Sequence, residues 1–235
     1  VIDGCPPGID LAAADIQEEV DRRAPSGHAS STPRREEDRV EILSGIFEGK
    51  TTGTPIALVI RNREADSGAY EELREVFRPG HGDFTYAKKY GIRDHRGGGR
   101  ASGRETAARV AAGAVARKLL AREGIAVSGC TVELGGVVAE TRSTKAIGSN
   151  RLLCPDEQAA ARMEARLDEA RREGDTLGGI VEVRVTGCPA GLGEPVFDKI
   201  DAELAQALMS IGTVKGVEIG AGFDAARLKG SQCND

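Results

Sequence analysis

Two neighbouring runs of the sequence, residues 78–83 and 90–106, combine histidine, arginine and glycine in a pattern typical of a binding site. The first contains Arg78 and His81, and the second contains His95. Both are too polar for a hydrophobic core and too glycine-rich for a regular helix or strand. Because guanidinium groups bind anions, the runs favour a site for an anionic ligand.

A helix is predicted to begin at the end of the second run. Ser102 and Glu105 have the spacing of a capping box, and apolar residues then recur with helical spacing over 103–121. The first amide groups of that helix, together with nearby arginines, favour a phosphate. These arginines are Arg96, Arg100 and Arg104. The alternative is that Ser102 only caps a helix and that the glycines only form turns.

The composition argues against several classes of partner. Acidic residues outnumber basic ones, 37 to 32, and aromatic residues make up only 3% of the chain, which is unlike a nucleic-acid-binding protein. Five scattered cysteines without a Cys-x-x-Cys pair suggest neither a disulfide framework nor a zinc site. No run approaches the ~18 apolar residues of a membrane span. We therefore expect a cytoplasmic protein that binds no metal, nucleic acid or membrane.

The order of predicted elements favours an α+β fold with an approximate internal repeat. Gly4-Cys-Pro-Pro-Gly-Ile9 recurs as Gly187-Cys-Pro-Ala-Gly-Leu192, and a predicted helix follows each copy. Apolar periodicity predicts helices over 10–23, 103–121, 156–173 and 198–210 and strands over 40–47, 56–60, 125–129, 132–138 and 180–185. The run at 49–51, Gly-Lys-Thr, lacks the upstream glycine of a P-loop and is predicted to form a turn.

Both ends of the sequence predict a truncated domain. Val1-Ile2 has the character of a strand end, and residues 230–235 form a polar loop. We expect a single domain over 1–235 that lacks segments on both sides.

Seven motifs, in order along nearly the whole chain, resemble those of chorismate synthase. The most specific are Phe77-Arg-Pro-Gly-His81 and the glycine-rich run that begins at Arg96. The full set lies at residues 34–36, 41–56, 77–81, 89–94, 96–107, 189–197 and 215–220.

The resemblance implies a β-α-β sandwich, a homotetramer and the last step of the shikimate pathway. In that step 5-enolpyruvylshikimate 3-phosphate loses phosphate and a proton by 1,4-anti elimination, giving chorismate. The implied enzyme is a carbon–oxygen lyase that needs reduced FMN without net redox change. Whether NADPH reduces the FMN on the protein, or a partner reductase supplies it, stays open.

The resemblance also assigns site residues. His81 is implied as a catalytic histidine that donates a proton to the reduced flavin, and Arg78 as an anion-binding residue. Arg23 is implied to bind the phosphorylated substrate or a nicotinamide nucleotide. The implied FMN contacts are Arg100, Ala101 and Ser102.

The sequence departs from the family pattern in three places. It lacks the opening Gly-Glu-Ser-His-Gly motif with the other catalytic histidine, it lacks the C-terminal flavin-binding part, and His28-Ala29 replaces the usual Ser-Arg. We therefore expect this piece alone to be inactive, and a catalytically inactive flavin-binding, phosphate-binding or assembly module is the alternative. A nicotinamide oxidoreductase is disfavoured, because no Gly-x-Gly-x-x-Gly run follows a predicted strand. His95 is more typical of a solvated or packing residue than of a catalyst.

Overall fold

The computed structural model describes residues 1–24, 38–62, 68–96 and 102–233. Contacts group the chain into two compact units, each built from two stretches of sequence. The first comprises Val1–Arg63 and Val110–Cys188, and the second comprises Glu64–Arg109 and Pro189–Asp235. Helices and strands occur in both units, which confirms the predicted α+β class.

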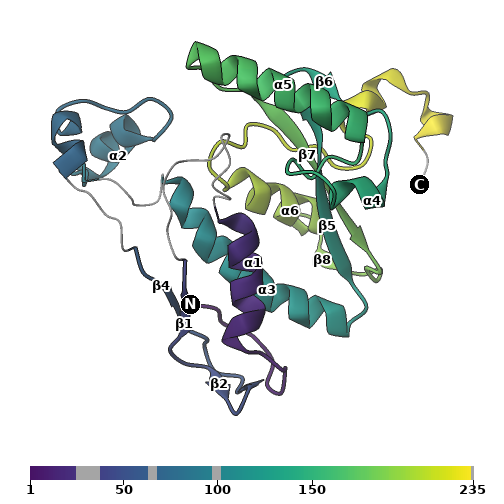
Figure 1. Cartoon of the computed structure of the whole chain (residues 1–235). Helices are drawn as coiled ribbons and strands as arrows, with labels where there is room; N and C mark the ends of the chain where they lie inside the picture. Colours follow the sequence, from purple (N-terminus) through teal and green to yellow (C-terminus); the bar gives the residue numbers. More distant parts are fainter. Residues whose placement is uncertain (25–37, 63–67, 97–101, 234–235) are drawn as a thin grey trace. The chain divides into compact units, whose positions relative to one another are not determined.

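Two helices and a pair of short strands form one core of the first unit. α1 (Ala13–Arg23) lies against α3 (Thr106–Arg122), and β1 (Val40–Ile42) pairs antiparallel with β4 (Leu58–Ile60) (Figure 1). Removing their apolar side chains from water stabilises this arrangement. The buried residues of this core, from these elements and from the segments that flank them, are Cys5, Ile9, Leu11, Ile16, Val20, Val40, Ile56, Ala111, Ala114 and Val115.

Charged pairs join α1 to α3 beside this core. Lys118 donates to Asp15 at 2.5 Å, and Arg117 pairs with Glu19. The helix predicted over 10–23 begins only at Ala13, because Asp10 instead forms a β-bridge with Lys50.

The Gly-Lys-Thr run lies in a hairpin formed by β2 (Ile46–Phe47) and β3 (Lys50–Thr51). Lys50 donates to the Asp10 carboxylate at 2.6 Å, and Thr51 is buried. The predicted strand over 40–47 is thus divided into β1 and β2, because Gly45 has a left-handed φ of 83° between them.

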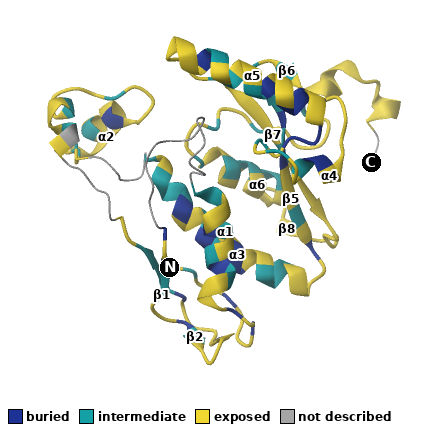
Figure 2. Ribbon diagram, viewed as in Figure 1, coloured by how far each residue is buried: buried dark blue, intermediate teal, exposed yellow. Residues whose placement is uncertain are grey.

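A three-stranded antiparallel sheet forms the rest of the first unit. β5 (Ala126–Leu134) lies between β6 (Val137–Val138) and β7 (Gly179–Thr186). Two separate strands were predicted, over 125–129 and 132–138. In the structure the residues between them also pair with β7, so that β5 is continuous, with a register shift between Thr131 and Glu133. The residues of β7 are mostly exposed (Figure 2).

Helix α5 (Glu157–Glu173) covers the second core of this unit. Met163 and Cys154 are fully buried and pack against Leu134 of β5 and Val137 of β6. The short α4 (Thr144–Ile147) precedes this segment. The charged helix predicted over 156–173 is therefore confirmed almost residue for residue.

Short helices and one small hairpin make up the second unit. Arg109, in the first turns of α3, donates to the hydroxyl and carbonyl oxygens of Ser210 at 2.7 and 3.0 Å. Helix α2 was not among the sequence predictions, because its mostly exposed face carries little apolar periodicity. The elements are η1 (Gly68–Leu73), α2 (Asp83–Tyr90), η2 (Gly103–Glu105), β8 (Gly193–Glu194), β9 (Asp198–Lys199), α6 (Ile200–Met209), η3 (Gly222–Arg227) and η4 (Gly230–Gln232).

The predicted repeat is matched in local backbone conformation. Gly4 and Gly8 have φ values of 75° and 79°, and their counterparts Gly187 and Gly191 have 74° and 92°. Glycine suits all four positions because side chains rarely adopt these angles. The copies differ in burial, since Cys5 is buried and Cys188 is exposed.

Within the described ranges, no helix has the length and apolar character needed to cross a membrane.

Candidate functional site

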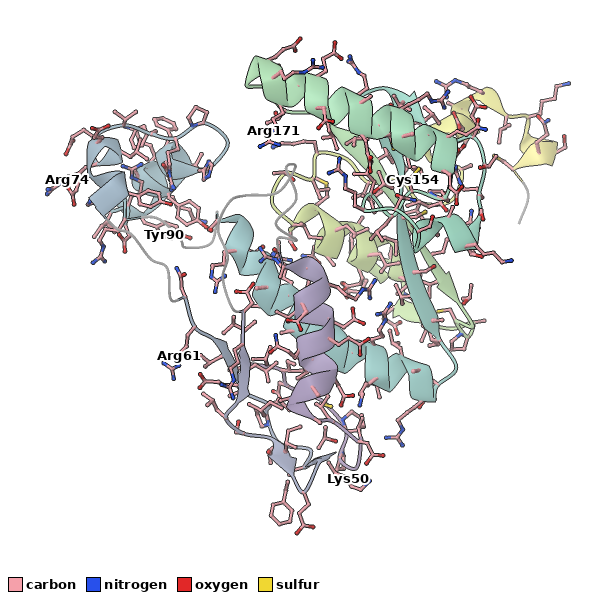
Figure 3. The ribbon with its side chains drawn as sticks, in the orientation of Figure 1. Lys50, Arg61, Arg74, Tyr90, Cys154 and Arg171 are labelled. Carbon is pink, nitrogen blue, oxygen red and sulfur yellow. The ribbon has the colours of Figure 1, made fainter. Side chains whose placement is uncertain are left out.

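The loop that carries Arg78 and His81 is closed by the first residue of α2. The Asp83 carboxylate accepts a hydrogen bond from the backbone amide of Arg78 at 3.0 Å, which ties the two ends of the loop together. Gly80 and Gly82 have φ values of 71° and 68°, so the chain reverses at positions that favour glycine. Figure 3 shows the side chains of this segment around the labelled Arg74 and Tyr90.

Asp83 also holds the Arg78 side chain in a two-bond pair. Arg78 Nε and Nη2 donate to Asp83 Oδ2 and Oδ1 at 2.9 and 3.0 Å. The Asp83 side chain is only 5% exposed, and that of Arg78 is 18% exposed. Hydrogen bonding to Arg78 holds the pKa of the Asp83 carboxyl well below its usual range, although burial opposes the shift. The same bonds raise the pKa of Arg78, so both groups are charged at neutral pH.

Arg93 is a second cation at this carboxylate. Its Nη1 donates to Asp83 Oδ2 at 2.7 Å, and its side chain is 8% exposed. The remaining bonds of its two Nη groups go to the backbone carbonyls of Leu73, Arg74 and Val76 at 2.6, 2.8 and 3.1 Å. Arg93 therefore fastens the end of η1 to α2 and has a structural role.

Arg78 retains donors that Asp83 does not occupy. A guanidinium group carries five N–H bonds, of which the pair with Asp83 uses two. In the part of the chain that the structure describes, Nη1 of Arg78 has no hydrogen-bond partner. The guanidinium carbon lies 5.8 Å from the ring centre of Tyr70. With two arginines and one aspartate, the cluster keeps one net positive charge, which suits an anion.

His81 is exposed at the tip of the loop, and one of its ring nitrogens is engaged. Nδ1 lies 2.9 Å from the carbonyl oxygen of Pro79. Because a carbonyl can only accept, this bond requires the proton on Nδ1. Nε2 is then the nitrogen left to gain or release a proton toward a ligand.

Ser102 caps the start of the helical segment, but not as a complete capping box. Its hydroxyl accepts from the amide of Arg104 at 3.3 Å, and a 3₁₀ turn precedes α3. The Glu105 carboxylate accepts instead from Arg109 Nε at 2.8 and 3.0 Å. The predicted helix over 103–121 is thus η2 followed by α3, because Glu105 bonds forward along the helix rather than back to the cap.

The other predicted FMN contacts, Arg100 and Ala101, lie outside the described residues, as does His28-Ala29. The chemistry of Ser102 fits the phosphate end of a flavin nucleotide through its hydroxyl, which can still donate a hydrogen bond. The amides of Arg104 and Glu105 already bond to Ser102 itself.

Arg23 belongs to the first unit, at the last position of α1. Its Nη1 donates to Asp38 Oδ2 at 3.2 Å, and the Asp38 side chain is 1% exposed. Arg23 also lines a groove of about 570 Å³ between helical and sheet residues of this unit. Arg22, Arg117 and Glu19 line the same groove, and Glu19 pairs with both of these arginines. Apolar residues such as Val183 complete the wall.

The structure thus brings together only part of the predicted set. Arg78 and His81 share one loop of the second unit, and Ser102 begins a later segment of that unit. His95 lies 3.5 Å from Glu71, with 20% of its side chain exposed, which agrees with a packing role. Sequence reasoning missed Asp83 and Arg93, although both stand in motifs that it singled out.

Comparison with known proteins gives a consistent result. The family model described as chorismate synthase matches residues 1–235. A chorismate synthase of Syntrophus aciditrophicus is 67% identical over 238 residues, covering all of this chain and 67% of that protein. One of Methanosarcina mazei is 56% identical, covering all of this chain and 66% of that protein.

A solved structure shows the same fold. A crystal structure of chorismate synthase matches with a TM-score of 0.78 and 36% identity, covering 99% of this chain and 68% of that one. The chain therefore spans about two thirds of the length of the relatives that it matches.

Proposed function

This chain belongs to the chorismate synthase family, and we propose that the protein carrying it converts 5-enolpyruvylshikimate 3-phosphate into chorismate. The observation that carries the proposal is the loop closed by Asp83, which holds the exposed imidazole of His81 and the oriented guanidinium group of Arg78 within one short segment. The alternative of an inactive binding module is not favoured, because the matching relatives are chorismate synthases over the whole of this chain.

The proposed reaction breaks two bonds of the substrate and releases its phosphate. The carbon–oxygen bond to phosphate breaks with its electron pair leaving on oxygen, a carbon–hydrogen bond loses its proton, and a new carbon–carbon double bond results. When bound, reduced FMN supplies the electron-rich ring that the family requires for this elimination, with no net redox change. Arg100, Ala101 and Ser102 would hold it.

The chain's own residues would bind charge and move a proton. Arg78 offers its unoccupied donors to an anionic group of the substrate, since a guanidinium fork binds two oxygens at once. Arg23 would bind a second anionic group. His81 would hold and release a proton at Nε2, because Nδ1 is engaged by Pro79.

Further properties implied by the family complete the proposal. They are a homotetramer, a cytoplasmic location and, as one source of electrons for FMN, NADPH. Neither a membrane nor a nucleic acid is expected to be a partner.

An anaerobic assay of the complete gene product tests this function. With chemically reduced FMN and the phosphorylated substrate, we expect chorismate and inorganic phosphate to appear in equal amounts. Oxidised FMN without a reductant should give neither product. Substrate binding without any chorismate under reducing conditions would support the inactive module instead.

A further inference from the structure

We propose that Asp83 is a positioning residue for the substrate: it fixes Arg78 so that the Nη1 edge of the guanidinium group meets the anionic group to be bound. This inference rests on the proposed function, because it assigns Arg78 to the substrate. It is based on the hydrogen bonds that the buried Asp83 carboxylate accepts from Arg78 and Arg93.

Asp83 fixes the orientation of the Arg78 side chain. Arg78 Nε and Nη2 face the two oxygens of Asp83, and the Arg78 backbone amide bonds to the same carboxylate. A guanidinium group is planar, so these bonds fix the plane and leave Nη1 on the side away from Asp83. An arginine fixed in advance loses less conformational entropy when a ligand binds.

Arg93 keeps the cluster positively charged. Asp83 alone would neutralise Arg78 and weaken its attraction for an anion. Arg93 contributes the compensating charge, and its own Nη groups donate to Asp83 and to three backbone carbonyls. The positive charge that remains in the cluster is therefore available through Arg78.

Arg78 is the most exposed side chain of the three. Asp83 and Arg93 have exposed side-chain fractions of 5% and 8%, whereas Arg78 keeps 18%. Burying a charged pair is costly unless hydrogen bonds compensate, and here both Asp83 oxygens accept hydrogen bonds while each Nη group of Arg93 donates two. The arrangement places the exposed part of the cluster at the arginine that would bind the substrate.

A double-mutant cycle in the complete, active enzyme tests the inference. Asp83→Asn should weaken binding of the phosphorylated substrate about tenfold or more, measured by calorimetry, while the affinity for FMN is unchanged. In an Arg78→Ala background the same change should have no further effect, because Asp83 acts through Arg78.

Asp156→Asn is the matched control. Asp156 is also a buried aspartate, but it accepts hydrogen bonds from the backbone amides of Glu140, Thr141 and Ala159 and, among the described residues, from no arginine. This variant should lower stability without changing substrate affinity. If Asp83→Asn behaves like the control, or if its effect adds to that of Arg78→Ala, the inference is wrong.

Arg78→Lys is a second variant for the case in which Asp83→Asn does not fold. Lysine keeps the charge but cannot form the two-bond fork, so we expect a loss of substrate affinity close to that of Arg78→Ala. Affinity equal to wild type would overturn the inference. Chorismate formation by the wild-type enzyme, measured in parallel, tests the proposed function separately.

Discussion

His81 has one ring nitrogen committed to the loop and one available for chemistry. The bond from Nδ1 to the Pro79 carbonyl fixes both the tautomer and the ring orientation. A proton transfer to or from this side chain would therefore occur at Nε2, on the exposed side of the loop.

Replacing His81 by alanine tests this role. We expect turnover to fall by about a hundredfold or more, since general acid–base groups typically contribute ~10²–10⁴ in rate. FMN should still bind, and the anaerobic assay with reduced FMN measures the effect. His95→Ala is the control, because His95 contacts Glu71 rather than the loop. Near wild-type turnover in His81→Ala would exclude the catalytic role.

Arg23 combines a predicted binding role with a structural one. Arg23→Ala should weaken substrate binding by roughly tenfold or more, the expected loss for one charge-assisted hydrogen bond. It should also lower the free energy of unfolding, because buried Asp38 loses a partner. Substrate titration and urea unfolding measure the two effects.

Arg22→Ala provides the comparison for Arg23. Arg22 lines the same groove, but it is 57% exposed and pairs with Glu19 on its own helix. Such surface pairs contribute about 0–1 kcal/mol, so little change in stability is expected. Equal substrate affinity in both variants and the wild type would remove Arg23 from the site.

At the scale of residues, the sequence was sufficient to single out Arg78 and His81 but not the residues that hold them. A histidine and an arginine in a polar glycine-rich run are recognisable by type. Asp83 and Arg93 are charged residues that sequence patterns assign to the surface, yet less than a tenth of either side chain is exposed. Their burial depends on how residues 73–78 fold around Arg93, which is a tertiary effect.

At the scale of elements, apolar periodicity predicted the long helices better than the strands. α5 was predicted to within one residue at its N-terminus, because Asp156 and the residues that follow carry a clear cap and stripe. Strand limits were less predictable, since the ladder between β5 and β7 decides where β5 ends. α2 was not predicted, because it is short and mostly exposed and therefore carries little apolar periodicity.

The cap of α5 makes a pH-dependent prediction. Asp156 accepts hydrogen bonds from the amides of Ala159, Thr141 and Glu140, and these bonds lower its pKa to about 2. An unperturbed aspartate titrates near ~3.9, so the stabilisation is full above that pH and disappears as the pH falls toward the lowered value.

Asp156→Ala should therefore lower the melting temperature at neutral pH, and the difference from wild type should shrink as the pH falls below about 4. Thermal melts across this range measure it. Ser143→Ala is the control, because Ser143 precedes α4 without a side-chain cap bond. A difference that stays constant down to the lowest pH would contradict the role of the carboxylate.

At the scale of the whole molecule, the α+β class and its chorismate synthase fold follow from the sequence, and the grouping of contacts into two units does not. Each unit joins two stretches that are distant in sequence. Local sequence patterns such as apolar periodicity do not indicate which distant stretches pack together. The single-domain organisation predicted from the sequence stays a prediction.

The chain passes from the first unit to the second just after Gly187, and packing there is tight. Gly187 has a φ of 74°, and a Cβ atom at this position would lie 2.2 Å from the carbonyl oxygen of Gly124. Gly191, in the same turn, has a φ of 92°, but a Cβ atom there would meet nothing within 4 Å beyond its own chain neighbours.

Comparing Gly187→Ala with Gly191→Ala separates the cost of backbone strain from the cost of a steric clash between the added methyl group and Gly124. Both variants should lose about 1–2 kcal/mol from the left-handed backbone. Gly187→Ala should lose a further ~1–3 kcal/mol or more, because backbone atoms must move to admit the methyl group. Urea unfolding of the two variants measures the difference. Equal losses would mean that the turn can shift freely, and that the approach of Gly187 to Gly124 does not constrain the end of the β5–β7 ladder.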